Sequence, residues 1–273
     1  MPELPEVEVV RQGLQNHLPG RHLVAVKTNH KKLRLPVPIK HLEQYIVGAR
    51  VSSVDRRAKY LLINMDNGAT LVIHLGMSGR LGLFPAAAPL KKHDHLRWQL
   101  DDGNELRFND SRRFGSVQVL APGETLKERL PGIGPEPLGP DFSAAYLKEK
   151  ARGKKQPIKN FLMDGRIVVG IGNIYACETL FRASIKPTKP AGRLGIKRWG
   201  KVVDAAQAVL QNAIASGGTT INDFVNASGK TGYFQLELQV YGRERQPCHA
   251  CKTPITRKVM AGRSTFFCPK CQK

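Results

Sequence analysis

The first apolar pattern along the chain has the spacing of a helix. Val7, Val10, Leu14 and Leu18 follow one another at intervals of three or four residues. Side chains at these intervals lie on one face of a helix, so the pattern predicts an amphipathic helix over residues 4–18.

Between residues 22 and 120 the apolar positions fall instead into short β-rich runs. Turn sequences such as Asp66-Asn67-Gly68 separate the runs. Short strands divided by turns are typical of a β-sandwich or a barrel. The clearest runs are Tyr60–Met65, Ala69–His74, Leu96–Leu100 and Ser116–Leu120.

Helical patterns return after a segment rich in Pro and Gly, PGIGPEPLGPD at residues 131–141. Pro and Gly at this density continue neither a helix nor a central strand, so we expect a linker between domains here. The helices predicted after it are Ser143–Lys150, Pro157–Met163, Asn173–Ala183 and Ile196–Ser216.

The size of the chain and its apolar content set the broad class. With 273 residues it can form two domains, and 41% hydrophobic residues predict a globular protein. No apolar run has the length of a membrane span, and MPELPEVEVV lacks the basic region of a signal peptide. We therefore expect a cytoplasmic protein with no membrane partner.

The charge balance points to the kind of partner. Lys and Arg number 43 against 22 Asp and Glu, a net charge of +21. Surface charge usually serves only solubility, but a surplus this large favours a polyanion, and nucleic acid is the common one in the cytosol. Charge alone distinguishes neither DNA from RNA nor binding from catalysis.

Four of the five cysteines form two close pairs near the C-terminus. Cys248-x2-Cys251 and Cys268-x2-Cys271 stand 16 residues apart. In a reducing cytosol such pairs favour a metal over disulfides. Four thiolates complete a tetrahedral zinc site and leave no position for a catalytic water, so we predict one structural Zn²⁺ per chain.

The segment between the cysteine pairs predicts a hairpin. Residues 256–267 have two β-rich halves around Ala261-Gly262-Arg263, and Arg263 is the charged group presented there. His249 lies between two ligands, but the thiolates already suffice, so we expect it to be a bystander. Cys177 lies in a helical run, where a buried apolar role is the expectation.

Several segments together resemble the bacterial formamidopyrimidine-DNA glycosylases of the Fpg/Nei family. Each segment alone is weak evidence, but the ordered combination runs almost from end to end and includes the four-cysteine tail. The segments are MPELPEVE at the start, RRAKYLL (56–62), HLGMSGRL (74–81), KHDH (92–95), RRFG (112–115), GPEPL (134–138), VVGIGNIYACE (168–178), GGTT (217–220) and QVYGR (239–243).

This resemblance implies an α+β multidomain fold. An N-terminal β-sandwich with a leading helix would carry catalysis, and a helix–two-turns–helix domain with a zinc ribbon hairpin would follow. The implied divisions are a catalytic domain at 1–133, a linker at 134–142, a DNA-binding domain at 143–238 and a zinc finger at 239–273.

Pro2 is the candidate nucleophile. Removal of Met1 would leave a secondary amine, which as an α-amine titrates near about pH 8, and nearby cations would lower that pKa further. Attack of such an amine at a sugar C1′ expels the base and forms an iminium. A proline that merely opens a helix is the ordinary interpretation, and only the resemblance favours catalysis.

The resemblance also implies the other catalytic residues. Glu3 would move protons at the sugar and the leaving base, and Glu6 would support the site. Acids in a first helical turn are otherwise explained by the helix dipole. Lys59 would donate a proton or contact the lesion, and Arg263 would clamp a phosphate during the later elimination.

A glycosylase must extrude its target nucleotide and fill the vacated stack. The resemblance assigns this to Met77, Arg112 and Phe114, although Met and Phe are more often core residues. Neighbouring glycines favour exposed loops for them. The expected phosphate contacts are His93, Arg112, Lys154, Lys159 and Asn173.

The implied partner is double-stranded DNA with oxidised purines or abasic sites, bound by a monomer. A loop over residues 217–232 would close over the damaged purine.

Two alternatives stay open: an endonuclease VIII-like glycosylase for oxidised pyrimidines, and a non-catalytic protein that binds damaged DNA. Leu4, where the sister family has glycine, and the stack-filling set favour the purine enzyme.

Overall fold

The computed structural model describes residues 2–217 and 238–273. These residues divide into two compact units. Unit one contains residues 2–131, and unit two contains residues 132–216 and 238–273. The loop predicted at 217–232 lies, from residue 218 onward, outside the described residues.

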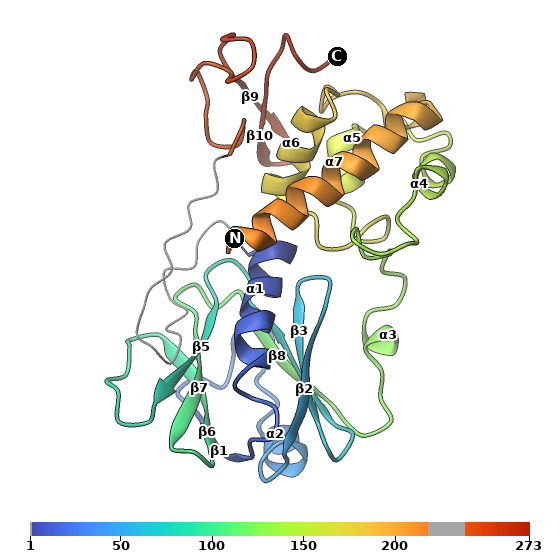
Figure 1. Ribbon diagram of the computed structural model, residues 1–273. Helices are drawn as coiled ribbons and strands as arrows, with labels where there is room; N and C mark the ends of the chain where they lie inside the picture. The colour runs from blue at the N-terminus through green and yellow to red at the C-terminus, as the bar shows by residue number, and fades with distance from the viewer. Residues whose placement is uncertain (1, 218–237) are drawn as a thin grey trace. The chain divides into compact units, whose positions relative to one another are not determined.

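The chain opens with helix α1 (Leu4–Gln15), as the apolar spacing predicts. The helix buries Leu4, Val7 and Leu14. It contacts β2 (Val51–Arg57), β3 (Tyr60–Met65) and β5 (Arg80–Pro85), so that it lies along the edges of two sheets (Figure 1). Leu18 is also buried but lies in the turn beyond the helix end. The apolar spacing therefore continued past the helix itself.

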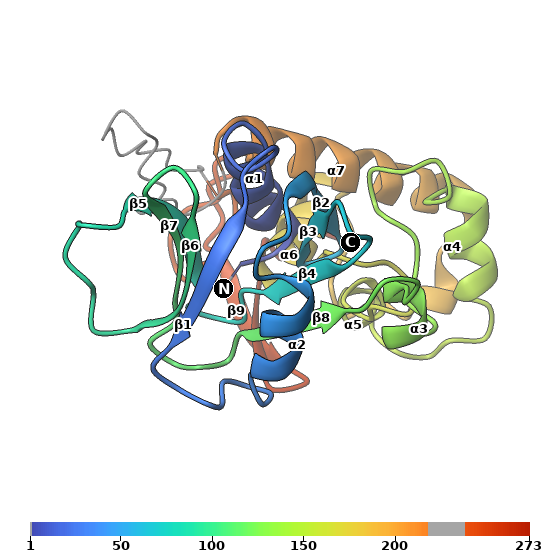
Figure 2. The same ribbon diagram turned by 90° about the horizontal axis from the view of Figure 1, so that it is seen from below.

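Unit one is a β-sandwich. In Figure 2 the sheet that contains β5, β6 and β7 lies at the left, and the sheet that contains β2, β3 and β4 lies to the right of it. Within the described residues it has two antiparallel four-stranded sheets, ordered β1-β6-β7-β5 and β2-β3-β4-β8. The strands are β1 (Leu23–Thr28), β2 (Val51–Arg57), β3 (Tyr60–Met65), β4 (Thr70–His74), β5 (Arg80–Pro85), β6 (Asp94–Leu100), β7 (Asn104–Asn109) and β8 (Ser116–Leu120).

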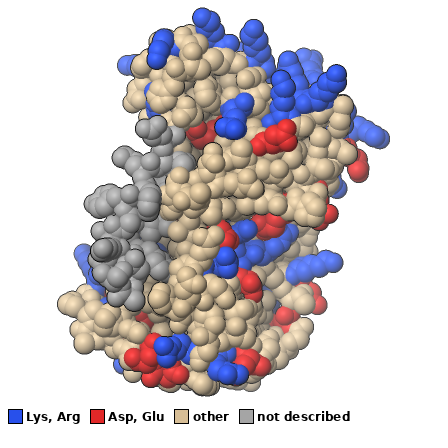
Figure 3. Space-filling model, in the orientation of Figure 1, with Lys and Arg blue, Asp and Glu red and all other residues tan. Residues whose placement is uncertain are grey.

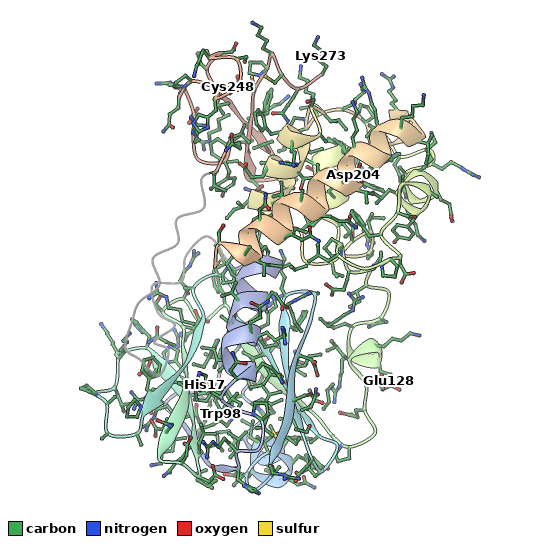
Figure 4. All side chains as sticks on the ribbon, in the orientation of Figure 1. His17, Trp98, Glu128, Asp204, Cys248 and Lys273 are labelled. Carbon is green, nitrogen blue, oxygen red and sulfur yellow. The ribbon has the colours of Figure 1, made fainter. Side chains whose placement is uncertain are left out.

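Side chains from both sheets form a single core between them. Trp98 and Phe108 from one sheet pack in the same cluster as Leu61 and Ile73 from the other, and all four are fully buried. Figure 4 labels Trp98 among the strands. Each such side chain contributes roughly 1.5–3 kcal/mol through burial. This shared core confirms the sandwich over the barrel.

One helix of unit one was not predicted. Helix α2 (Ile39–Tyr45) lies inside the region that the sequence assigned to strands, and of its residues only Leu42 is buried. A seven-residue segment with a single buried position has no repeated apolar spacing from which a helix could be predicted. A further single turn, α3 (Leu126–Arg129), begins at a capping box made by Thr125 and Glu128.

Unit two contains a helical core. The α-helices agree with the predicted ranges to within a residue at each end, whereas the short 3-10 turn at Ala191–Arg193 was not predicted. Phe161 and Trp199 pack with ring centroids 5.5 Å apart. None of the described helices combines the length and apolarity needed to cross a membrane. The helices are α4 (Ala144–Lys150), α5 (Ile158–Leu162), α6 (Asn173–Arg182), the short η1 (Ala191–Arg193) and α7 (Ile196–Ala215).

Part of the Pro- and Gly-rich segment is held within unit two. The Gly134 N–H donates to the Gly165 carbonyl at 2.8 Å, and the Val169 N–H donates to the Pro135 carbonyl at 3.2 Å. These bonds fix the segment beside the turns between α5 and α6. The four-part division drawn from the sequence stays a prediction.

The predicted C-terminal hairpin is present as β9 (Thr256–Met260) and β10 (Arg263–Phe267). Its two-residue turn is Ala261-Gly262, and both residues have positive φ angles, of 46° and 70°. That conformation is the hairpin turn that matches the twist of paired strands. Arg263 is consequently the first residue of β10 rather than part of the turn.

Candidate active site and nucleic-acid interface

The start of α1 positions the first candidate catalytic residue, Glu3. Glu3 is fully buried and is the N-cap of the helix, directly after Pro2. The Glu3 N–H donates to Glu6 Oε2 at 2.8 Å as part of a capping box, so the helix start is rigid. A carboxylate fixed at this position can exchange protons with a group bound beside it.

Lys59 lies in the tight turn between β2 and β3. Ala58 beside it has φ of 56°, and its carbonyl accepts a 2.9 Å hydrogen bond from Arg56 Nη1. Arg56 Nε also donates to Glu8 Oε2 of α1 at 2.9 Å. Burial raises the pKa of Glu8, but hydrogen bonds from Arg56 and Arg11 outweigh burial and lower it. The Lys59 turn is thus tied to α1.

His74 is a further member of this region. It pairs with Tyr60 across β3 and β4. Burial lowers the pKa of His74 to about 4, helped by the positive charges of Arg34 and Lys59. The neutral ring accepts a 3.0 Å hydrogen bond from the Gly76 N–H at Nδ1. The only signal in the sequence was its place at the start of the HLGMSGRL segment.

Two neighbouring loops present the predicted stack-filling residues to solvent. Met77 is 40% exposed and Phe114 is 45% exposed, so both large apolar side chains face solvent. The Arg112 guanidinium lies 4.8 Å from the centre of the Phe114 ring, within cation–π range. The three side chains thus form an exposed apolar and cationic group, as the neighbouring glycines suggested.

His93 lies next to these loops. Its carbonyl accepts the Asp110 N–H at 3.0 Å, and its ring centroid is 5.8 Å from that of His95. The backbone at His93 is therefore held to the loop that carries Arg112 and Phe114. The half-buried ring lies on the same unit as the stack-filling group.

Unit two presents a basic surface. Lys154 is exposed, and Figure 3 shows Lys and Arg side chains gathered around α4 and the start of α7. Such a concentration of positive charge can bind the phosphate backbone of a nucleic acid, because Lys and Arg displace the counterions of the phosphates. The exposed basic residues of these segments are Lys148, Lys150, Arg152, Lys154, Lys155, Lys197, Arg198 and Lys201.

Lys159 differs from its predicted role as a phosphate contact. Its side chain is fully buried, and Nζ donates a 2.8 Å hydrogen bond to the Thr265 hydroxyl in β10. The basic run around it suggested a solvent-facing position, but α5 turns this residue inward. In the conformation described here, Lys159 connects a helix to the hairpin rather than reaching solvent.

Asn173 begins α6 and also contacts the hairpin. Its Nδ2 donates to the Ser264 carbonyl at 2.9 Å, while its buried Oδ1 has no partner among the described residues. The start of α6 is therefore fixed beside β10. Backbone N–H groups at such a helix start can bind phosphate, and the phosphate contact of Asn173 stays a prediction.

Glu178 was missed by the sequence reasoning. Its nearly buried carboxylate accepts backbone hydrogen bonds from Gln239, Val240 and Tyr241, at 2.9 to 3.0 Å. Burial raises its pKa, although these bonds and Arg243 act in the opposite direction. The residue anchors the entry to the C-terminal module. An acid within the apolar VVGIGNIYACE segment was the available signal.

The four paired cysteines converge on one point, in the module where Figure 4 labels Cys248. Their sulfur atoms all lie within 4.8 Å of one another, and those of Cys251 and Cys268 are 3.4 Å apart. Four sulfurs bound to zinc at about 2.3 Å lie roughly 3.8 Å from each other, so the cluster fits the ion. His249 lies outside this cluster of ligands.

The thiol pKa values reflect this crowding. Hydrogen bonds from Thr253 lower the pKa of Cys251 to about 6, and the hydrogen bond with Cys251 raises that of Cys271 to about 12. Arg263 is exposed at the start of β10, outside the cluster. Cys268 directly follows β10, so the cluster lies at the end of the strand that begins with Arg263.

Comparisons with known proteins agree with this geometry. Residues 1–117 match the formamidopyrimidine-DNA glycosylase N-terminal domain, residues 133–225 its H2TH domain, and residues 245–273 the zinc finger found in FPG and IleRS. The zinc finger match and the four close cysteines establish a site for one structural zinc ion.

Full-length relatives and solved structures extend the match. The chain is 48% identical to a formamidopyrimidine-DNA glycosylase of Acidithiobacillus ferrooxidans, with complete coverage of both chains. A Lactococcus lactis FPG variant in complex with Fapy-dG-containing DNA has a TM-score of 0.91 at 34% identity, again with complete coverage of both. The Lactococcus lactis Fpg complex with abasic-site DNA gives 0.91 at 35%, covering 99% of each chain.

Proposed function

The chain belongs to the formamidopyrimidine-DNA glycosylase family, and from this premise we propose a bifunctional DNA glycosylase and AP lyase of base-excision repair. Its substrates are double-stranded DNA with oxidised purines, such as 8-oxoguanine and formamidopyrimidines, and abasic sites. Because this substrate is DNA, we propose that the protein acts at the nucleoid, in the cytoplasm. The observation that carries the proposal is the family match over the whole chain. The buried Glu3 directly after Pro2 supports it.

In the first step the secondary amine of Pro2, freed by removal of Met1, attacks C1′ of the extruded nucleotide. The C1′–N bond breaks, and the damaged base leaves with a proton delivered through Glu3. The C1′–O4′ bond of the sugar ring then breaks, O4′ takes up the proton that the amine loses, and the amine and the opened sugar are joined as an iminium. The rigid capping of α1 by Glu6 supports this role, because it fixes the carboxylate beside the nucleophile.

The iminium acidifies the neighbouring C2′ hydrogen, so the 3′ phosphate and then the 5′ phosphate can leave by β- and δ-elimination. We assign Lys59 and Arg263 to proton transfer and phosphate contact in these steps. The zinc site serves this chemistry only by ordering the hairpin that carries Arg263.

Met77, Arg112 and Phe114 fill the space that the extruded nucleotide leaves, and their exposure supports this role. Phosphates are bound by His93 and Arg112 of unit one and by Lys154 and Asn173 of unit two. The inward position of Lys159 removes it from this set. The chain acts as a monomer.

The test is a duplex with a single 8-oxoguanine, treated with the protein and borohydride. Excision, strand cleavage and a covalent adduct on the peptide that begins with Pro2 are expected. The same protein with an uncleaved N-terminal extension is the matched control and should form no adduct. An adduct of full yield in the control places the nucleophile elsewhere.

A lesion panel separates the remaining alternatives. Faster excision of oxidised pyrimidines than of 8-oxoguanine would favour the endonuclease VIII-like activity. Tight binding of damaged DNA without excision or adduct would favour a non-catalytic binding protein.

A further inference from the structure

Asp110 joins the two loops that carry the stack-filling residues. Its fully buried carboxylate accepts a 2.6 Å hydrogen bond from Ser78 Oγ at Oδ1 and a 2.8 Å hydrogen bond from the Gly115 N–H at Oδ2. Ser78 follows Met77 in the β4–β5 loop, and Gly115 follows Phe114 in the β7–β8 loop. Neither bond belongs to a strand ladder, so the two loops are joined through one side chain.

Hydrogen bonds of the Ser78 hydroxyl and of the Asp110 carbonyl extend this connection to Arg112 and Arg113. The Ser78 hydroxyl donates to Asp110 and also accepts the Arg112 N–H at 3.2 Å. The Asp110 carbonyl lies 2.9 Å from His95 Nε2 and accepts the Arg113 N–H at 3.2 Å. These bonds hold the backbone at Arg112 and hold Arg113 in its left-handed conformation, with φ of 55°.

The two loops also touch directly at Gly76. A Cβ atom at this position would lie 2.4 Å from the carbonyl carbon of Phe114, which is closer than backbone atoms allow. No side chain therefore separates the loops here. The spacing between the loops that carry Met77 and Phe114 is set by backbone contact and by the buried carboxylate, not by adjustable surface groups.

We propose that Asp110 and Ser78 are positioning residues for lesion extrusion. They hold Met77, Arg112 and Phe114 in advance at the spacing needed to enter the duplex, which avoids the entropy cost of ordering these loops on DNA. The inference rests on the proposed function, because it takes these three side chains to fill the vacated stack. Asp110 and Ser78 act through them without contacting DNA.

The test compares Ser78→Ala with Ser53→Ala. Ser53 donates a 2.8 Å hydrogen bond to Asp55 in β2, so the control removes a similar bond of the same unit away from these loops. Loss of a hydrogen bond to a charged group predicts roughly tenfold slower excision of 8-oxoguanine paired with cytosine. The loss should be smaller when the lesion lies opposite an abasic analogue, since extrusion then costs less.

Two further variants complete the design. Ser78→Thr keeps the hydroxyl and should restore most of the rate, and Asp110→Asn should resemble Ser78→Ala. A 2-aminopurine next to the lesion reports unstacking, and its fluorescence rise should slow in step with excision from the paired duplex. Melting temperatures confirm that each variant is folded, and Ser78→Ala alone suffices if Asp110→Asn does not fold.

The outcomes separate this inference from the proposed function. Equal loss on paired and unpaired substrates indicates a general structural role and overturns the inference. It is also overturned if Met77→Ala and Phe114→Ala slow extrusion while Ser78→Ala behaves like Ser53→Ala. If Met77→Ala and Phe114→Ala leave extrusion unchanged, the stack-filling role itself is wrong, and the inference falls with it.

Discussion

The ammonium group of Lys159 donates a hydrogen bond of 2.8 Å to the hydroxyl of Thr265, and both side chains are fully buried. The bond joins α5 to β10, two residues beyond Arg263. A buried hydrogen bond of this kind fixes the position of the hairpin, and its loss leaves a buried hydroxyl without this donor, whereas a phosphate contact contributes to the salt dependence of binding. The two roles therefore have different signatures.

We predict that Lys159→Met lowers the free energy of unfolding by about 1–3 kcal/mol without changing the salt slope of DNA affinity. Lys154→Ala, at an exposed position, is the comparison: its log–log salt slope should fall by about 0.9 with little loss of stability. Urea denaturation and DNA titrations at several salt concentrations measure both quantities. A reduced slope for Lys159→Met would restore it as a phosphate contact.

The zinc site gives a second prediction. Cys268→Ser should lose bound zinc and DNA affinity together, because the ion orders the hairpin that carries Arg263. Cys177→Ala is the matched control, since Cys177 is buried in the same apolar cluster but is not among the four converging cysteines. Metal analysis and DNA titration provide the measurements. Full DNA affinity in a zinc-free sample would contradict the prediction.

His74 predicts a specific pH dependence of stability. Its pKa is near 6.5 in the unfolded chain and about 4 in the folded protein. Between these values the unfolded state binds a proton that the folded state excludes, so stability is lost as pH falls from 6.5 to 4. The full effect is roughly 3 kcal/mol, at about 1.4 kcal/mol per pKa unit.

His74→Asn should lack this component while keeping an acceptor for the Gly76 N–H. The difference in unfolding free energy between wild type and variant should therefore shrink as pH falls through this window. Urea denaturation at a series of pH values measures it. Parallel stability curves for the two proteins would show that His74 does not titrate in this way.

The sequence predicted those features that depend on local pattern. Short β-rich runs between turn sequences identified β3 and β8 with their bounds, and the cysteine spacing identified the metal cluster. Helix α2 was missed because one buried residue in seven leaves no period to detect. Exposure of Met77 and Phe114 followed from the glycines beside them.

Features that depend on tertiary contacts were not predicted. Lys159 was misplaced because a basic run appears solvent-facing until the strand that receives its ammonium group is known. Asp110 and Glu178 resemble any other acids in the sequence, and their roles come from groups that distant segments supply. These groups are the Ser78 hydroxyl for Asp110 and the Val240 N–H for Glu178. The roles of such single residues can be assigned only once the tertiary contacts of the fold are known.

Glu3 provides the most direct test of the proposed first step. Glu3→Gln keeps the size of the side chain and an oxygen for capping α1, but it removes the group that delivers the proton to the leaving base. Excision of 8-oxoguanine should fall roughly 10²–10⁴-fold, the usual contribution of general acid–base catalysis. Cleavage at a preformed abasic site should fall much less, because no base has to depart.

The matched variant is Glu6→Gln at the other position of the same capping box. Its amide oxygen can still accept the Glu3 N–H, so it changes the local charge without removing the proposed proton donor. Excision and abasic-site cleavage are measured in parallel for both variants, with melting temperatures to establish folding. Equal losses of the two activities in Glu3→Gln would mean that Glu3 serves the architecture of the helix start, and that the proton reaches the base by another route.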